Sequence, residues 1–292
     1  MEKSKLDALI NLLDDPDKTV FDLVEKELLK ESKQIIPVLE EKWESSFDVN
    51  FQERIENLIQ CLQFKETHNK LDSWVKTNSE ERDLFTAFWI VDQFQYPDLN
   101  LLNIQLKVEN IRKKIWLELN NTLTLLEKTT ILNHFLFNVN GFSVNHSNKN
   151  SSQNCFFSQI LDSKKGNSIS ISILYTILAR QLELPAYFID FPKNPLIAIV
   201  EPELAKKVHC RTIDTDVLFY INPSNKGAIT SIKEIEYHLR KNEFLPLHQF
   251  TEPKSDILFI QRLLESLSES YQALGMIDKE EQIQQLLQLL NQ

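Results

Sequence analysis

The sequence predicts an α+β fold that is mostly helical. Apolar residues recur at helical spacing along most of the 292 residues, whereas runs suited to β-strands gather between residues 186 and 221. The composition, with 42% hydrophobic and 25% charged residues, is typical of a globular protein with more than one core. We therefore expect a helical array (1–77), a mixed core (78–250) and a C-terminal helical hairpin (251–292).

The first 77 residues are predicted to form short amphipathic helices. Leu6, Leu9, Ile10 and Leu13 have the spacing of one helix face, and the segment Asp14-Asp15-Pro16 ends that helix. The pattern of leucine-rich helix, Asp-Pro break and second helix resembles a HEAT-type repeat. Later stripes continue the array: Val20, Val24, Leu28; Ile36, Leu39, Trp43; Phe51, Ile55, Leu58, Leu62.

Two helices are expected to open the mixed core. The run DLFTAFWIVDQFQYP is apolar nearly all round, which is typical of a helix packed between layers, and Asn78-Ser79 before it suits a helix N-cap. Thr124 and Glu127 have the spacing of a capping box, so a second helix should begin there and stop at Gly141.

A longer helix and three strands are expected next. The run SISISIL alternates as a strand would, but its apolar residues also form a helical stripe that continues to Leu182. A segment of that length, ended by Pro185, favours a helix. The runs AYFIDF (186–191), LIAIV (196–200) and VLFYI (217–221) then predict an antiparallel sheet packed on this helix.

The last 42 residues of the sequence predict a helical hairpin of the TPR-like kind. One apolar stripe runs from Ile257 to Leu274, Gly275 permits a turn, and a second stripe runs from Ile283 to Leu290.

Composition excludes several kinds of partner. A formal charge of −10 without a basic face disfavours direct nucleic-acid binding, and four scattered glycines make a nucleotide-binding loop improbable. Apolar runs such as LIAIV are too short to span a bilayer, and the first residues lack the order of a signal peptide. We expect a cytoplasmic protein with no membrane contact, whose partner is a protein or a peptide.

The three cysteines do not form a recognisable site in the sequence. Cys61, Cys155 and Cys210 are widely separated and lack the paired spacing of zinc sites or disulfide frameworks. We therefore expect reduced thiols, no metal and no cofactor.

A family resemblance emerges from the order of several segments. WLELNNTLTLLEKTTILNHFLF, NCFFSQILDSKKGNSISISILYTILARQLELP and VLFYINPSNKGAI, placed between a helical array and a terminal hairpin, resemble bacterial transglutaminase-like proteins of the SirB regulator type. The resemblance implies a papain-like core. It also implies a cysteine nucleophile at the start of the core helix, a histidine base on the next strand and an orienting aspartate on the following strand.

The residues at the positions that the resemblance designates are unsuited to this chemistry. The core helix begins near Ser168 and Ser170, where the superfamily has its cysteine. Asn194 replaces the expected histidine, and an amide does not accept a proton at neutral pH. Asn222 replaces the aspartate that would stabilise an imidazolium. Ser168, Ser170, Asn194 and Asn222 are thus predicted to be vestigial cleft positions, and the two asparagines either bind an amide ligand or stabilise turns.

Cys155 remains an alternative nucleophile. It precedes the segment FFSQIL, where a helix dipole could lower its pKa, although a cysteine beside two phenylalanines is more often a buried apolar residue. His209 could serve as its base, whereas His209 and Cys210 are predicted to face opposite sides of an extended chain.

Two hypotheses for function follow from these residues. The preferred one is a non-catalytic transglutaminase-like protein that acts as a protein-interaction or regulatory module. The alternative is a cysteine-dependent acyl-transfer enzyme or hydrolase that uses Cys155.

Overall fold

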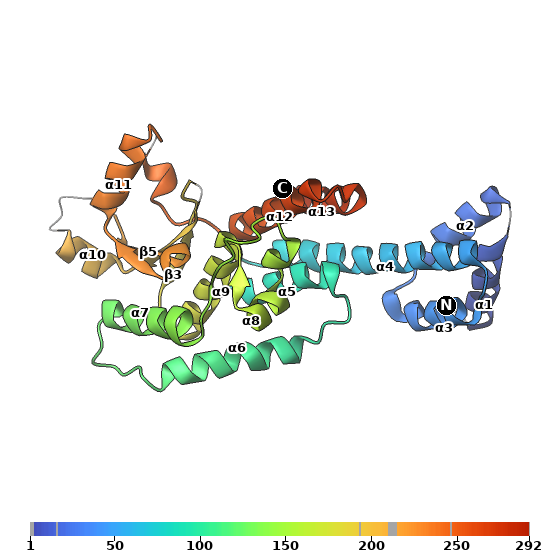
Figure 1. Cartoon of the computed structure of the whole chain (residues 1–292), viewed down its shortest axis with the longest axis horizontal. Helices are drawn as coiled ribbons and strands as arrows, with labels where there is room; N and C mark the ends of the chain where they lie inside the picture. The colour runs from blue at the N-terminus through green and yellow to red at the C-terminus, as the bar shows by residue number, and fades with distance from the viewer. Residues whose placement is uncertain (1–2, 16, 193, 210–214, 246, 292) are drawn as a thin grey trace. The chain divides into compact units, whose positions relative to one another are not determined.

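The computed structural model describes residues 3–15, 17–192, 194–209, 215–245 and 247–291. Pro16 of the Asp-Pro break, Lys193 and Cys210 lie outside these residues. The contacts between residues divide the chain into two units, 1–76 and 77–292, and each is described by itself (Figure 1).

The first unit is an array of helices around a small apolar core. The helices are α1 (Lys3–Asn11), α2 (Lys18–Leu28), α3 (Ile36–Ser45) and the long α4 (Val49–Lys76). The stripes that the sequence predicts supply this core, which contains Leu6, Ile10, Leu13, Val24, Leu28, Ile35, Leu39, Ile55, Leu58 and Leu62. Trp43 differs from the prediction: it is partly exposed, and its indole Nε1 donates to Glu56 Oε1 at 2.9 Å.

The second unit is built around helix α9 (Ser168–Gln181), whose residues 170–179 are all buried. The helical prediction for SISISIL is confirmed. Helices from distant parts of the sequence pack against α9, among them α5 (Leu84–Gln95), α6 (Leu101–Trp116), α8 (Phe157–Ser163) and α12 (Asp256–Ala273). This layered packing explains why α5 is apolar nearly all round.

The start of α5 differs from the sequence-based expectation. Asp83, not Asn78-Ser79, caps the helix: its carboxylate accepts from the backbone N–H groups of Phe85 and Thr86 at 3.2 and 3.0 Å. The capping box of α7 (Leu125–Asn133) is confirmed, with Thr124 and Glu127 bonding reciprocally. The chain then continues as a π-helix (His134–Val139) and leaves it at Gly141, whose φ is +73°.

A four-stranded antiparallel sheet follows α9 in the order β3-β4-β5-β6. It consists of β3 (Ala186–Ile189), β4 (Leu196–Val200), β5 (Val217–Asn222) and β6 (Ala228–Thr230). A cluster on the sheet joins Ile189, Leu196, Ala198, Val217 and Tyr220 to helix α11 (Ile232–Lys241). Because α9 also contacts β3 and β4, both faces of the sheet are covered, which explains the continuous apolar run LIAIV.

The sequence analysis did not identify β6, α11 or helix α10 (Pro202–Val208), nor the two-residue parallel pair β1 (Ser143–Val144) and β2 (Lys165–Gly166). All of them are short except α11, whose buried Ile232, Ile235 and Leu239 have helical spacing and whose start carries a capping box between Ser231 and Glu234, so a usable signal was present in the sequence.

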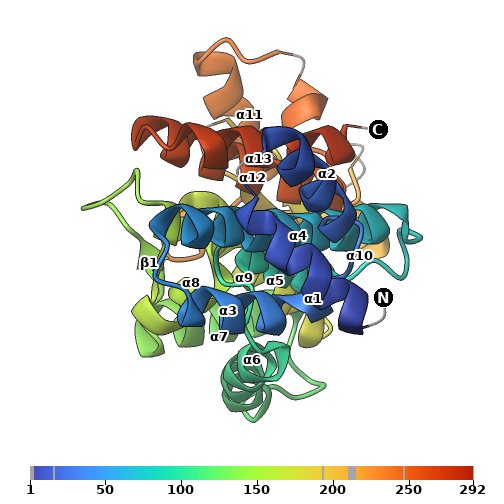
Figure 2. The ribbon, with the colours of Figure 1, turned by 90° about the vertical axis from the view of Figure 1, so that its right-hand side faces the viewer.

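The C-terminal hairpin consists of α12 and α13 (Ile277–Leu290), which lie side by side in both views (Figures 1 and 2). Helix α12 also contacts α5 and α9, and Phe259 of α12 stacks on Phe188 of β3 with ring centroids 4.1 Å apart. None of the described helices combines the length and apolar character needed to cross a membrane.

Asp92 links α5 to α8 through a buried carboxylate. Its Oδ2 accepts from the backbone N–H of Ser158 at 2.9 Å, and its Oδ1 accepts from the Ser158 hydroxyl at 3.2 Å. Burial raises the pKa of Asp92 to about 6, because desolvation outweighs the hydrogen bonds that favour its charged form. The side chain therefore caps α8 at neutral pH at an electrostatic cost.

The raised pKa of Asp92 predicts a pH dependence of stability. Because the folded state binds this proton more tightly than the unfolded state, the contribution is fully present below pH 3.8 and is lost as pH rises through about 6. Relative to Asp92→Asn, the wild type should lose up to about 3 kcal/mol of unfolding free energy over this range. Urea unfolding at several pH values measures the difference, and the exposed Asp98→Asn controls for the loss of one carboxylate. If the wild type instead gained stability relative to Asp92→Asn as the pH rose, the assignment would be wrong.

Helix α9 ends at a strained residue. Glu183 has a φ of +61°, and the next residue, Leu184, donates its N–H to Ala179 O at 2.9 Å, so Glu183 occupies the left-handed position that usually holds glycine.

Glu183→Gly should raise the free energy of unfolding by about 1 kcal/mol, because glycine adopts this conformation without a Cβ penalty. Gly275 follows α12 with a φ of +69°, so replacing this glycine tests the opposite substitution in the same conformation. No atom lies within 4 Å of the position that a Cβ would take there, so Gly275→Ala should destabilise by conformation alone. Chemical denaturation of both variants measures their free energies of unfolding. If both variants were stabilised, or both destabilised, the explanation would be wrong.

Candidate functional site

The start of α9 is held by a reciprocal cap between Asn167 and Ser170. Asn167 Oδ1 accepts from the Ser170 N–H at 2.7 Å, and Ser170 Oγ accepts from the Asn167 N–H at 3.0 Å. Ser170 Oγ also donates to the carbonyl of Asn154 at 2.7 Å. Ser170, a predicted vestigial position, is therefore buried and fully engaged in capping the helix.

Asn154 attaches the preceding loop to this cap. Its Nδ2 donates to Asn148 O at 2.7 Å, and its Oδ1 accepts from Asn145 Nδ2 at 2.9 Å. Its backbone carbonyl also accepts from the Asn167 N–H at 3.1 Å. Side-chain amides satisfy such a loop well because each offers both donors and an acceptor.

Cys155 lies against the N-cap of α9, although it comes from a different segment. Its Sγ accepts from Asn167 Nδ2 at 3.1 Å, and the same amide group donates to Ser266 Oγ of α12 at 2.9 Å. The side chain is completely buried. The sulfur therefore lies at the start of the core helix, beneath α12.

The environment of Cys155 suppresses its thiolate. Burial raises the pKa of the Cys155 thiol to about 12, and this effect exceeds the lowering by hydrogen bonds from Ser266 and Asn167. Cys155 is therefore a neutral thiol at pH 7. The dipole of α8, which the sequence offered as an activating feature, instead meets the carboxylate of Asp92 at Ser158 N.

His209 lies against the sheet in a contact with the main chain of β5. It follows the last residue of α10, and its ring Nε2 lies 3.0 Å from the carbonyl oxygen of Val217 in β5. The expected extended chain does not include His209, whose φ of −83° and ψ of 4° are not extended, and Cys210, the other residue of that expectation, lies outside the described residues. Among the described contacts, the side chains that hydrogen-bond to Cys155 Sγ are those of Asn167 and Ser266, and neither is a base; the carboxylate of Glu269 acts on the thiol only by charge, which raises its pKa further.

The remaining vestigial positions lie apart from Cys155 in their contacts. Ser168 is the first residue of α9 and is partly exposed, whereas Asn194 is exposed in the connection between β3 and β4. Asn222 ends β5, and its Oδ1 accepts from Asn225 N at 3.2 Å. That contact gives Asn222 the turn-stabilising role which the sequence offered as one of two alternatives.

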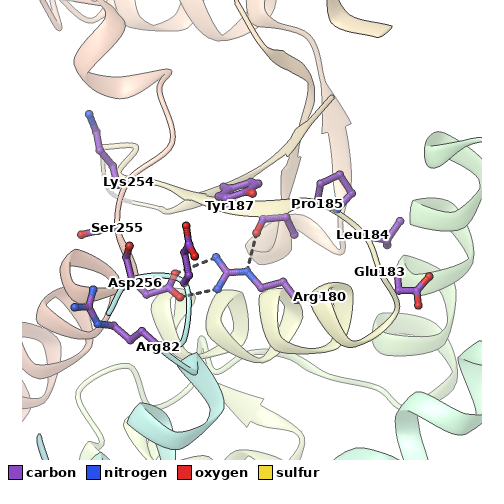
Figure 3. A pocket seen from close by; sticks show the side chains of 12 residues that line it. Arg82, Arg180, Glu183, Leu184, Pro185, Tyr187, Lys254, Ser255 and Asp256 are labelled. Carbon is purple, nitrogen blue, oxygen red and sulfur yellow. Dashed lines mark hydrogen bonds and ion pairs between the residues drawn. The ribbon is translucent and has the colours of Figure 1, made fainter. Parts of the chain in front are cut away.

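The sequence reasoning missed a cavity at the other end of α9. It has a volume of about 530 Å³ and lies between the end of α9, β3, the start of α12 and residues 79–82 (Figure 3). Arg180 crosses its floor: Nη1 and Nη2 donate to the two carboxylate oxygens of Asp256 at 2.6 and 2.9 Å, and Nε donates to Ala186 O at 2.9 Å. A basic residue in a last helical turn was too common a feature to single it out.

Among the described residues, no group of three or more histidine, cysteine, aspartate or glutamate side chains is arranged to hold a metal ion.

Comparison with known proteins identifies relatives of this chain. The chain is 23% identical to a UPF0162 protein of Xylella fastidiosa (strain 9a5c) over 211 residues, which cover 68% of this chain and 69% of that protein. It is 26% identical over 159 residues to F-box only protein 21 of mouse and of human, covering 54% of this chain but only 23% of those proteins.

No solved structure matches the chain. The model of the transglutaminase-like superfamily matches residues 103–265, which span α6 to α12 and include the capped start of α9 and Cys155. Because the match covers more than half of the 292 residues, the chain belongs to the transglutaminase-like superfamily.

Proposed function

We propose that this chain is a non-catalytic member of its superfamily that acts as a protein-interaction or regulatory module. The observation that carries the proposal is the state of Cys155, which is completely buried and hydrogen-bonded to an amide and a hydroxyl. Its thiol has a pKa raised to about 12. A cysteine nucleophile requires the opposite conditions, namely solvent access and a lowered pKa.

The positions at which the resemblance expects the nucleophile and the orienting aspartate are used for structure, and Asn194, at the position of the expected base, is an exposed amide. Ser170 caps α9, and Asn222 closes the turn after β5. Neither an amide nor a capping hydroxyl can replace an imidazole, whose general-base action is worth roughly 10²- to 10⁴-fold in rate. What the superfamily core retains here is therefore the scaffold.

The proposal extends to the type of protein, its helical repeats and its partner. We place the chain with the SirB type, and we assign a HEAT-like character to the first unit and a TPR-like character to the α12–α13 hairpin. Such helical surfaces serve protein contacts. The net charge of −10 supports a protein or peptide partner over direct nucleic-acid binding in the cytoplasm.

One observation favours the alternative, a cysteine-dependent acyl-transfer enzyme or hydrolase. Cys155 Sγ lies at the N-cap of α9, the end of the core helix where the superfamily has its thiol. For this role the sulfur would have to become accessible, which requires α12 to withdraw Ser266, and a base would have to approach it.

Thiol alkylation separates the two functions. In a Cys210→Ser background, iodoacetamide should label the exposed Cys61 at least about 100-fold faster than the buried Cys155. Labelling of Cys155 should become fast only in denaturing urea. Mass spectrometry of the two peptides measures both rates in the same sample, so Cys61 is an internal control.

Assays with amide and thioester substrates complete this test. We expect the wild type and Cys155→Ala to give the same product formation, at the level of the uncatalysed reaction. Turnover that depends on Cys155, or labelling of Cys155 at pH 6 ahead of Cys61, would establish the enzymatic alternative instead.

A further inference from the structure

The cavity above Arg180 shares one lining residue with a smaller one. Glu183 lines both this cavity and another of about 130 Å³. We call the combined surface the Glu183 groove. Its residues are Ser79, Glu80, Arg82, Arg180, Leu184, Pro185, Ala186, Tyr187, Lys254, Ser255 and Asp256 on one side of Glu183, and Arg112, Trp116, Leu119, Asn120, Asn121, Lys128, Gln181 and Leu182 on the other.

The floor of the groove is rigid and electrically balanced. The bidentate pair between Arg180 and Asp256 cancels two charges, and the third bond of Arg180, to Ala186 O, fixes β3 to α9 (Figure 3). A ligand therefore meets walls that are already positioned, which reduces the entropy cost of binding.

A partner strand cannot extend the sheet here. The outer edge of β3 is occupied, because Ala186 O accepts from Arg180 and Phe188 O accepts from the Lys254 N–H at 2.8 Å. Recognition in the groove must therefore use side chains rather than the main-chain ladder of strand addition.

Two charged and two aromatic side chains of the groove are suited to recognition. The carboxylate of Glu183 and the ammonium of Lys254 form no ion pair among the described contacts, and Figure 3 shows them at opposite ends of the larger cavity with Tyr187 between them. Tyr187 and Trp116 are 41% and 59% exposed. Exposed tyrosine and tryptophan are the residues most enriched at the centres of protein interfaces.

We propose that the Glu183 groove binds an extended peptide segment of a partner protein. The segment carries a basic side chain opposite Glu183, an acidic side chain opposite Lys254, and apolar residues against Tyr187 and Trp116. Charge complementarity assigns this pattern, since Glu183 and Lys254 carry opposite charges and lie at opposite ends of the larger cavity. The inference rests on the proposed interaction function, because it names where and by what chemistry a protein partner is held.

The test uses fluorescein-labelled peptides of about ten residues, which span roughly 30 Å when extended. Each peptide has one arginine, one aspartate and a central leucine in an alanine–serine background. The set includes every separation between the two charged residues, in both orders along the peptide. Fluorescence anisotropy with the full chain should give Kd values below about 1 mM for at least one arrangement. Peptides with glutamine and asparagine in place of the charges should bind at least about tenfold more weakly.

Variants of the groove make the assignment specific. Glu183→Gln and Lys254→Gln should each weaken the best peptide about tenfold or more, and Trp116→Ala should do the same. Glu243→Gln is the matched control, since Glu243 has a φ of +60° but lies outside the groove, and the exposed Lys233→Gln controls for net charge. Glu183→Lys should bind the peptide in which glutamate replaces arginine.

The outcomes separate this inference from the proposed function. If no peptide binds, or if groove and control variants bind alike, the groove is not the site. The proposed non-catalytic function still stands in that case, provided that Cys155 is unreactive. If the peptides bind as described but Cys155 proves to be a working nucleophile, the groove stands and the module without catalysis is overturned.

Discussion

The amide side chain of Asn167 makes the contacts on which the core of the second unit depends. It accepts from Ser170 N to start α9, and it donates to both Cys155 Sγ and Ser266 Oγ. Segments 12 and 99 residues away in the sequence are thereby joined to the first turn of the central helix. Buried groups of this kind are expensive to leave unpaired, so the network restrains all three segments together.

This network also decides what the sulfur can do. A helix start normally favours a thiolate, yet here the first amides of α9 are satisfied by Asn167 and Ser170, and α12 excludes water from the sulfur. Desolvation then dominates the local electrostatics. At this position the scaffold buries the Cys155 thiol in the apolar core and does not expose it as a nucleophile.

The sequence predicted the strongly periodic elements and missed features that depend on tertiary contacts. Periodicity identified α9 and the three longer strands, because burial of an apolar face leaves a repeating pattern. The start of α5 was misplaced because Asn78, Ser79 and Asp83 are all good caps, and only packing selects Asp83.

The candidate site shows the same division between local pattern and long-range contact. Reading the resemblance residue by residue identified Ser168, Ser170, Asn194 and Asn222 as positions unsuited to catalysis. It could not show that Cys155 approaches the N-cap of α9, since this requires the loop held by Asn154. Nor could it find the Glu183 groove, whose walls come from segments more than 170 residues apart.

The closed edge of β3 has a consequence for the protein at high concentration. Unpaired strand edges serve as templates on which neighbouring molecules add strands, and this is a common route to fibrils. Here one arginine from α9 and the main chain before α12 occupy that edge. A sheet buried on both faces is thereby prevented from growing sideways at β3, so the apolar strands that stabilise the core are shielded from self-association.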